Sequence, residues 1–132
     1  MVAGAEEPQL QVAHGGCAED ITADDVTSRT QPLVKLLHEA RQQTPIVLVE
    51  DRSYSGSWLI GSQAERNQSS RRALQEQYQQ LLQAGVDRLF YVDGESLLGP
   101  DRDDTTDGSH PSDLGFFRHA EALEPVLRKA LS

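Results

Sequence analysis

An unbroken apolar run at residues 45–50 constrains the fold of this chain more than any other feature. The run reads Pro-Ile-Val-Leu-Val-Glu, is rich in β-branched side chains and has the length of a strand. Runs of this kind are typical of strands that are buried on both faces of a parallel sheet, because helices cover both sides of such a sheet. The sequence therefore predicts an α/β protein that holds this segment in a parallel sheet.

A first helix is predicted to begin at Thr22. Thr22 followed by Asp25 forms a capping-box pattern, in which each side chain satisfies a free backbone N–H group of the other residue. Pro32 lies inside the helical pattern, so we expect a kink or a restart of the helix there. The apolar residues that share one face of this helix are Val26, Leu33, Leu36, Leu37 and Ala40.

Two more helices alternate with two more strands. The helices are predicted over residues 65–84, with Gly85 as a natural stop, and over residues 113–131. Strands are indicated at residues 88–92 and at residues 10–14. The residues that the last helix is expected to bury are Phe116, Phe117, Ala120, Leu123, Val126, Leu127 and Leu131. This alternation predicts an α/β sandwich with a parallel sheet.

Length and charge limit the domain organisation and the partners. A chain of 132 residues suffices for one domain with a core and is too short for two. We therefore expect a loose tail at residues 1–8 and a single domain over residues 9–132. The formal net charge of −9 argues against nonspecific binding of nucleic acid and against docking to anionic membranes.

The sequence bears on location as well. No apolar stretch reaches the length of a membrane span, and the first residues lack the basic start and apolar run of a signal peptide. We therefore expect a soluble chain that is not exported as written. The single cysteine, Cys17, excludes an intrachain disulfide and leaves the redox compartment open.

The chemistry of a parallel sheet is expected in the loops beyond the carboxyl ends of its strands. The last of these loops contains Asp107-Gly108-Ser109-His110-Pro111, directly before the C-terminal helix. An Asp and a His three residues apart on a tight turn can form a hydrogen bond that fixes the tautomer of the ring. The other ring nitrogen is then available as a general base.

The surrounding run resembles a known family. Residues 106–116 (T-D-G-S-H-P-S-D-L-G-F) look like the final conserved block of the SGNH (GDSL-type) ester hydrolases. Residues 44–54 and 91–99 are also similar to one bacterial branch of that family, so the similarity covers about residues 17–132. The resemblance implies a three-layer, flavodoxin-like fold and hydrolysis of acyl or acetyl esters of sugars or small molecules. It also implies that Asp107 orients the base and that His110 is the base.

Two parts of the family pattern are missing. The family opens with a strand that leads to Gly-Asp-Ser, whose serine is the nucleophile, and this sequence contains no such block. Asp20 stands at the place of the family's oxyanion-hole asparagine, where a carboxylate would repel a developing oxyanion. We therefore expect a partial domain without the family's first two strands. Its first remaining strand would be an exposed sheet edge through which the chain could form a homo-oligomer.

Other residues could replace the missing serine, and three hypotheses follow. Ser53, Ser55 and Ser57 lie after the buried strand, at the same sheet edge as His110, and are the candidate substitute nucleophiles. The chain is then an active ester hydrolase completed by such a serine or by an oligomeric partner. Alternatively, it is a truncated, non-catalytic family remnant or a binding module that uses the old cleft. A third hypothesis is an unrelated acidic α/β interaction domain.

No metal or cofactor is expected. Residues 103–108 resemble the first half of a calcium-binding loop. Such a loop needs a bidentate glutamate at its twelfth position, and Leu114 stands there.

Overall fold

The structure, a computed structural model, describes residues 11–14 and 21–132. The elements alternate along the chain in the order β1 (Gln11–His14), α1 (Ala23–Ala40), β2 (Ile46–Val49), α2 (Gly61–Gln83), β3 (Leu89–Val92) and α3 (Asp113–Leu131). The expected tail at residues 1–8 lies outside the described residues. Among the described residues, no helix has the length and apolar character needed to cross a membrane.

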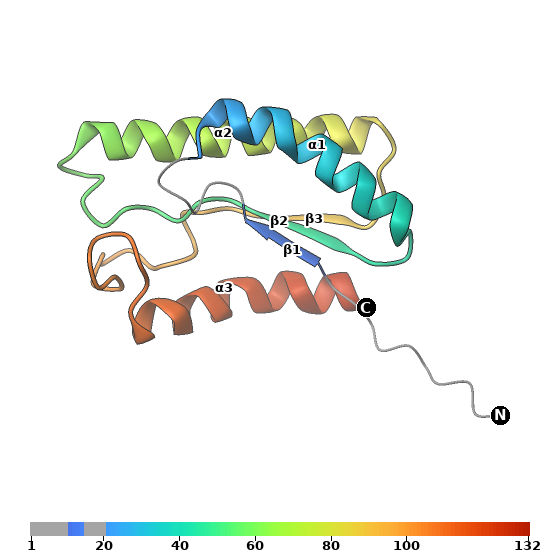
Figure 1. The fold of residues 1–132 in the computed structure, drawn as a ribbon. Helices are drawn as coiled ribbons and strands as arrows, with labels where there is room; N and C mark the ends of the chain where they lie inside the picture. Colours follow the sequence, from blue (N-terminus) through green and yellow to red (C-terminus); the bar gives the residue numbers. More distant parts are fainter. Residues whose placement is uncertain (1–10, 15–20) are drawn as a thin grey trace.

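The strands form one parallel sheet in the order β1-β2-β3. Helices α1 and α2 cover one face of this sheet, and α3 lies on the other face (Figure 1). The predicted α/β sandwich with a parallel sheet is therefore confirmed. Its layer order is two helices, the sheet and one helix.

The central strand β2 fills both layers of the core. All of its residues are buried. Because side chains alternate along a strand, Ile46 and Leu48 join the cluster beneath α1 and α2, whereas Val47 and Val49 join the cluster beside α3. This two-sided burial explains why Ile46–Val49 contains no polar residue.

Helix α1 begins as the sequence predicts. Thr22 is the N-cap, and its hydroxyl accepts a hydrogen bond from the backbone N–H of Asp25 (3.2 Å) while the Asp25 carboxylate accepts one from the backbone N–H of Thr22 (3.0 Å). The helix continues through Pro32, so the expected restart is wrong. Packing against α2 holds this region, since Gln31 donates to the side chain of Gln77 at 2.8 Å.

The buried face of α1 differs from the predicted one. Val26 and Val34 are buried, whereas Leu33 and Leu36 are 46% and 65% exposed, and Ala40 is exposed as well. The helix is rotated so that Val34, and not Leu33, faces the sheet. Both faces contain enough apolar side chains to be candidates, and the sequence alone does not rank them.

The buried face of α3 is also narrower than predicted. Leu123, Val126 and Leu127 pack against the cluster beside the sheet. The expected core residues that are exposed instead are Phe116, Phe117, Ala120 and Leu131. The cause is that α3 packs against β2 and β3, and the described residues place no second helix beside it on this face.

Helix α2 begins at Gly61, ahead of the predicted start at residue 65. Its N-cap is Ile60, whose side chain makes no capping hydrogen bond. A turn at Gly56, whose carbonyl accepts from the N–H of Ile60 (2.9 Å), leads directly into the helix. The early start therefore has no capping signal in the sequence. The predicted stop is confirmed, because Gly85 adopts a positive φ of 85° after the last turn.

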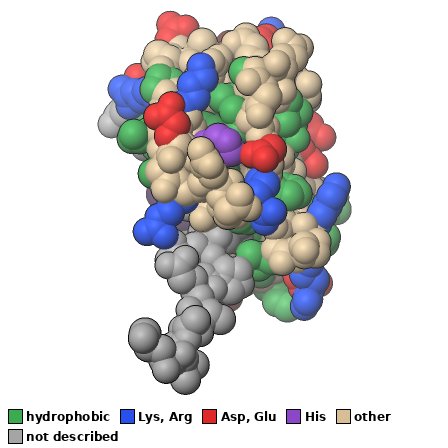
Figure 2. Space-filling view, turned by 90° about the vertical axis from the view of Figure 1, so that its right-hand side faces the viewer, with side chains coloured by type: hydrophobic (Ala, Val, Ile, Leu, Met, Phe, Trp, Pro, Cys, Tyr) green, Lys and Arg blue, Asp and Glu red, His purple; other side chains and the backbone are tan. Residues whose placement is uncertain are grey.

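Figure 2 views the end of the molecule where α1 terminates and the strands begin. Acidic and basic side chains are interspersed on this face, and neither sign of charge forms a continuous patch there. The candidate catalytic groups lie at the opposite end of the sheet, where the strands end.

Candidate active site

Asp107 and His110 form a hydrogen-bonded pair. The imidazole Nδ1 of His110 lies 2.6 Å from Oδ2 of Asp107. The other carboxylate oxygen, Oδ1, accepts hydrogen bonds from the backbone N–H groups of His110 (2.7 Å) and Ser109 (3.0 Å). Both oxygens of the carboxylate are thus committed to the residues that carry the imidazole.

A tight turn produces this geometry. Gly108 has a φ of 87°, a conformation that favours glycine. The turn is closed by a bridge between Thr105 and Pro111 and by a hydrogen bond from the N–H of Thr106 to the carbonyl of His110 (2.8 Å). The Asp-Gly-Ser-His sequence therefore folds locally into a loop that presents the ring.

The electrostatics of the pair suit a base and its orienting acid. The backbone N–H of His110, followed by its ring and the N–H of Ser109, holds the pKa of the Asp107 carboxyl well below its usual range. An ionised Asp107 favours a proton on Nδ1 of the imidazole, which leaves Nε2 available as an acceptor. Both side chains are more than half exposed, so a small molecule from solvent can reach them.

The first turn of α3 is hydrogen-bonded to the loop that precedes the Asp107–His110 turn. Ser112 caps the helix by accepting from the N–H of Gly115 (3.3 Å), and its own N–H donates to the carbonyl of Asp104 (2.8 Å). The side chain of Asp104 is buried beside Arg118, 3.6 Å from its Nη1. The turn is therefore held between the preceding loop and the start of the last helix.

The segment after β2 binds the same turn from the other side. Arg52 donates from Nε to the carbonyl of Ser109 and from Nη2 to the hydroxyl of Ser109 (3.1 Å). The N–H of Ser55 donates to the carbonyl of Gly108 at 2.9 Å. The expectation that the Asp-His turn lies at the rim where β2 ends is thereby confirmed.

Glu50, directly after β2, connects the end of this strand to β3 and to the residues that follow β3. One oxygen of its buried carboxylate accepts from the hydroxyl of Tyr91 (2.6 Å) and the other from the N–H of Gly94 (2.7 Å). Burial, together with the bond to Glu50, raises the pKa of the Tyr91 hydroxyl. The pair joins β2 and β3 just below the candidate site.

Asp51 and Asn67 form a second buried contact at this rim. The amide nitrogen of Asn67 donates to Oδ2 of Asp51 (3.2 Å) and to the carbonyl of Arg52 (2.9 Å). Burial raises the pKa of Asp51 to about 6, against the opposing effect of nearby arginines, Arg52 first. Sequence reasoning missed this layer of contacts. The available signal was three charged residues directly after a buried strand, at positions 50–52.

A cavity of about 550 Å³ opens beside the imidazole. Its volume lies in the range of small-molecule pockets, roughly 300–1,000 Å³. Its lining residues are Glu50, Arg52, Leu97, His110, Pro111, Phe116, His119, Ala120 and Leu123. The polar groups come mainly from the end of β2 and from the turn that carries Asp107 and His110, and α3 supplies most of the apolar wall.

Two of the three candidate serines have side-chain partners other than His110. The hydroxyl of Ser53 accepts from Arg71 (2.8 Å), and the hydroxyl of Ser55 lies 2.6 Å from that of Thr105. Ser53 and Ser57 line a separate cavity of about 420 Å³. Within the described ranges, none of these serines is hydrogen-bonded to the His110 ring. Asp20, the residue at the oxyanion position, lies outside the described residues.

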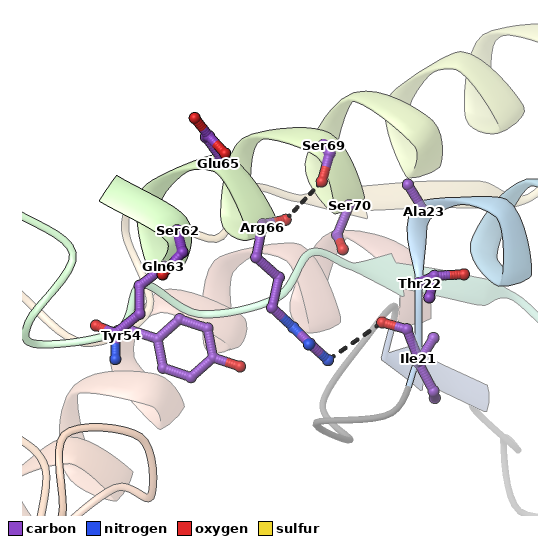
Figure 3. A pocket seen from close by; sticks show the side chains of 10 residues that line it. All are labelled: Ile21, Thr22, Ala23, Tyr54, Ser62, Gln63, Glu65, Arg66, Ser69 and Ser70. Atoms are coloured by element: carbon purple, nitrogen blue, oxygen red, sulfur yellow. Dashed lines mark hydrogen bonds between the residues drawn. The ribbon is translucent and has the colours of Figure 1, made fainter. Parts of the chain in front are cut away.

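A third cavity lies between the start of α1 and the first half of α2 (Figure 3). Arg66 extends from α2 across this cavity and donates to the carbonyl of Ile21 at 3.3 Å. Tyr54, from the loop after β2, lines the same cavity. This contact ties the beginning of α1 to α2, at a place separate from the imidazole.

The described residues contain no group of three or more His, Cys, Asp or Glu side chains placed to hold a metal ion. The chemistry that this arrangement supports is proton transfer by an oriented imidazole next to a cavity.

Comparisons with known proteins identify the family and the fold that this chain shares. The model of the GDSL-like Lipase/Acylhydrolase family matches residues 13–128. The structure is similar to that of a GDSL-like lipase from Bacteroides ovatus, with a TM-score of 0.80 and 27% identity over 86% of this chain and 34% of that one. No curated protein matches the sequence.

Two more distant solved structures share the fold. A salicylyl-acyltransferase from a tetracycline biosynthetic pathway has a TM-score of 0.64 and 17% identity, over 83% of this chain and 34% of that one. A GDSL-like lipase from Bacteroides thetaiotaomicron has a TM-score of 0.58 and 16% identity, over 92% and 63% respectively. The chain thus spans about a third of the length of the first two relatives.

Proposed function

The chain belongs to the GDSL-like lipase/acylhydrolase family, and we propose that it provides the base and its orienting carboxylate in the hydrolysis of carboxylic esters. The observation that carries the proposal is the 2.6 Å contact between His110 and Asp107 at the edge of a cavity. Family membership sets aside the hypothesis of an unrelated interaction domain.

The proposed roles follow from the two ends of the imidazole. A hydroxyl nucleophile attacks the ester carbonyl carbon while its proton passes to Nε2 of His110. Asp107 keeps the other nitrogen protonated and stabilises the imidazolium. The same proton then goes to the oxygen of the departing alcohol, and water repeats the sequence on the acyl intermediate.

The nucleophile is proposed to come from outside the described residues. The hydroxyls of Ser53 and Ser55 are engaged with Arg71 and Thr105. The relatives of this chain are longer, and only about a third of the Bacteroides ovatus lipase is matched. This supports a single partial domain over residues 9–132, in which β1, β2 and β3 represent the last three strands of a five-stranded, flavodoxin-like sheet.

The test is hydrolysis of p-nitrophenyl acetate by the purified chain beside His110→Ala and Asp107→Asn. An imidazole that acts as general base contributes on the order of 10²–10⁴ in rate, so His110→Ala should lose that factor. His38→Ala is the matched control, because His38 also pairs with a carboxylate, that of Asp87 at 3.3 Å, far from the cavity. Equal rates for all four proteins would exclude hydrolysis by this chain alone.

A binding module is the second candidate function. It is favoured by the cavity itself, which is formed even though no serine among the described residues is hydrogen-bonded to the His110 ring. The test is titration of the chain with acetate or butyrate, monitored by the NMR signals of the His110 ring. Shifts of these signals in a chain that shows no hydrolysis would support a binding module.

A further inference from the structure

The position of the His110 ring relative to the sheet depends on contacts that reach beyond its own turn. The hydrogen bonds of Asp107 fix the shape of the turn, but all of them stay within residues 107–110. Residues that tie the turn to the end of β2 are therefore needed to place the imidazole at the cavity. Arg52 and Ser55 make such contacts.

Arg52 binds the residue next to His110 with two donors. Its Nε and Nη2 contact the carbonyl and the hydroxyl of Ser109. The planar guanidinium presents these donors in a fixed fork, so it restrains both the distance and the orientation of Ser109. A lysine offers a single flexible ammonium group and does not reproduce this geometry.

The arginine is itself held firmly. Its side chain is only 10% exposed, and its Nη1 lies 3.9 Å from the buried carboxylate of Asp51. Its carbonyl accepts from Asn67, which is buried in α2. The restraint on Ser109 is thus anchored to the end of β2 and to α2.

We propose that Arg52 is a positioning residue for the candidate base, which it holds at the cavity through Ser109. Like His110, Arg52 lines the cavity, so the proposed restraint and the imidazole border the same space. The inference rests on the proposed role of His110. Catalytic groups need placement to within about half an ångström, and loss of such a restraint affects rate more than substrate binding.

The first test is NMR spectroscopy of Arg52→Gln and Arg52→Lys. Leu97 and Leu123 line the same cavity as His110, so NOE contacts between their methyl groups and the His110 ring in the unmodified chain would report where the ring lies. Both variants should weaken these contacts, Arg52→Gln more than Arg52→Lys, while the ring keeps the Nδ1-protonated tautomer. Asp107→Asn should have the opposite effect, changing the tautomer and retaining the methyl contacts.

Controls separate this role from general destabilisation. Arg128→Gln removes an exposed arginine that pairs with Glu124 at 2.7 Å, and it should change neither signal. Ser109→Ala keeps the carbonyl contact and should give an intermediate loss, which covers the case in which Arg52→Gln does not fold. Unchanged methyl contacts in folded Arg52→Gln would overturn the proposal.

The second test applies where hydrolysis is detected. Arg52→Lys should lower kcat by about ten- to a hundredfold with little change in KM, since a misplacement of about 1 Å can cost on the order of 10² in rate. A rise in KM at unchanged kcat would contradict a positioning role. Because the NMR test needs no turnover, absence of hydrolysis would count against the proposed function and not against the role of Arg52.

Discussion

Gly115, in the first turn of α3, approaches the carbonyl oxygen of Asp104 so closely that a β-carbon at position 115 would lie 2.2 Å from that oxygen. The contact holds the loop before the Asp107–His110 turn against the start of the helix after that turn. Only a residue without a side chain permits this approach.

Gly115→Ala should therefore destabilise the protein. The added methyl group forces the backbone at Asp104 to move, and overpacking of this kind costs about 1–3 kcal/mol. Urea denaturation measures the change in the free energy of unfolding. Gly61→Ala is the control, because a β-carbon at Gly61 has no neighbour within 4 Å, and it should be close to neutral. Equal stabilities of the two variants would show that this contact does not exist.

The Asp107 carboxylate should contribute to the stability of the fold at neutral pH and lose that contribution in acid. Its folded pKa is depressed by hydrogen bonds from the backbone and ring of His110. A depressed pKa contributes stability that is present above the unfolded value, about 3.9, and is lost as the pH falls from there through the folded value. The stability difference between the unmodified chain and Asp107→Asn should thus shrink below about pH 4. A pH-independent difference in urea denaturation would contradict this.

Asp51 should act in the opposite direction. Burial raises its folded pKa to about 6. The folded state then binds the proton more tightly than the unfolded one, so stability is full below about pH 4 and declines as the pH rises through 6. Asp51→Asn should remove this decline and gain on the order of 2 kcal/mol at pH 8 relative to pH 4. Thermal unfolding at both pH values measures the change, and Asp103→Asn, at an exposed loop carboxylate, is the control.

Ser53, Ser55 and Ser57 should resist a fluorophosphonate probe. Such a probe labels hydroxyl groups that a neighbouring base activates, and Ser53 and Ser55 are bonded to Arg71 and Thr105 instead. Peptide mass spectrometry after labelling identifies any modified serine. Labelling of one of the three that disappears in His110→Ala would establish that serine as the nucleophile.

The open edge of β1 should promote self-association. In the described part of the chain, β1 pairs with β2 alone. An unpaired strand edge is a template for pairing with another chain. Light scattering over a range of concentrations should detect a dimer, and a monomer throughout that range would contradict the expectation.

The sequence predicted the features that depend on near neighbours. The β2 run, the Thr22–Asp25 cap and the Asp107–His110 pair each involve residues at most three positions apart or a continuous pattern. Such features are determined by local backbone geometry and by burial. Both leave a direct trace in the spacing of apolar and polar residues along the sequence.

The features that the sequence did not predict depend on distant partners. The contact of Arg52 with Ser109 joins residues 57 positions apart. The exposure of Leu33 and Phe116 depends on which neighbours the helices meet, and an apolar stripe does not specify that. The start of α2 at Gly61 was missed because Ile60 makes no side-chain cap.

Three consecutive charged residues follow β2, and each is hydrogen-bonded to a different part of the fold. The partners of Glu50 are Gly94 and Tyr91, that of Asp51 is Asn67, and that of Arg52 is Ser109. The register of β2 in the sheet consequently also determines where the His110 imidazole lies. A shift of this strand by a single residue would turn its side chains to the opposite faces of the sheet. Glu50, Asp51 and Arg52 would then no longer reach the partners described above. An insertion or deletion within residues 46–49 would thus displace the His110 ring from its cavity even if the molecule still folded.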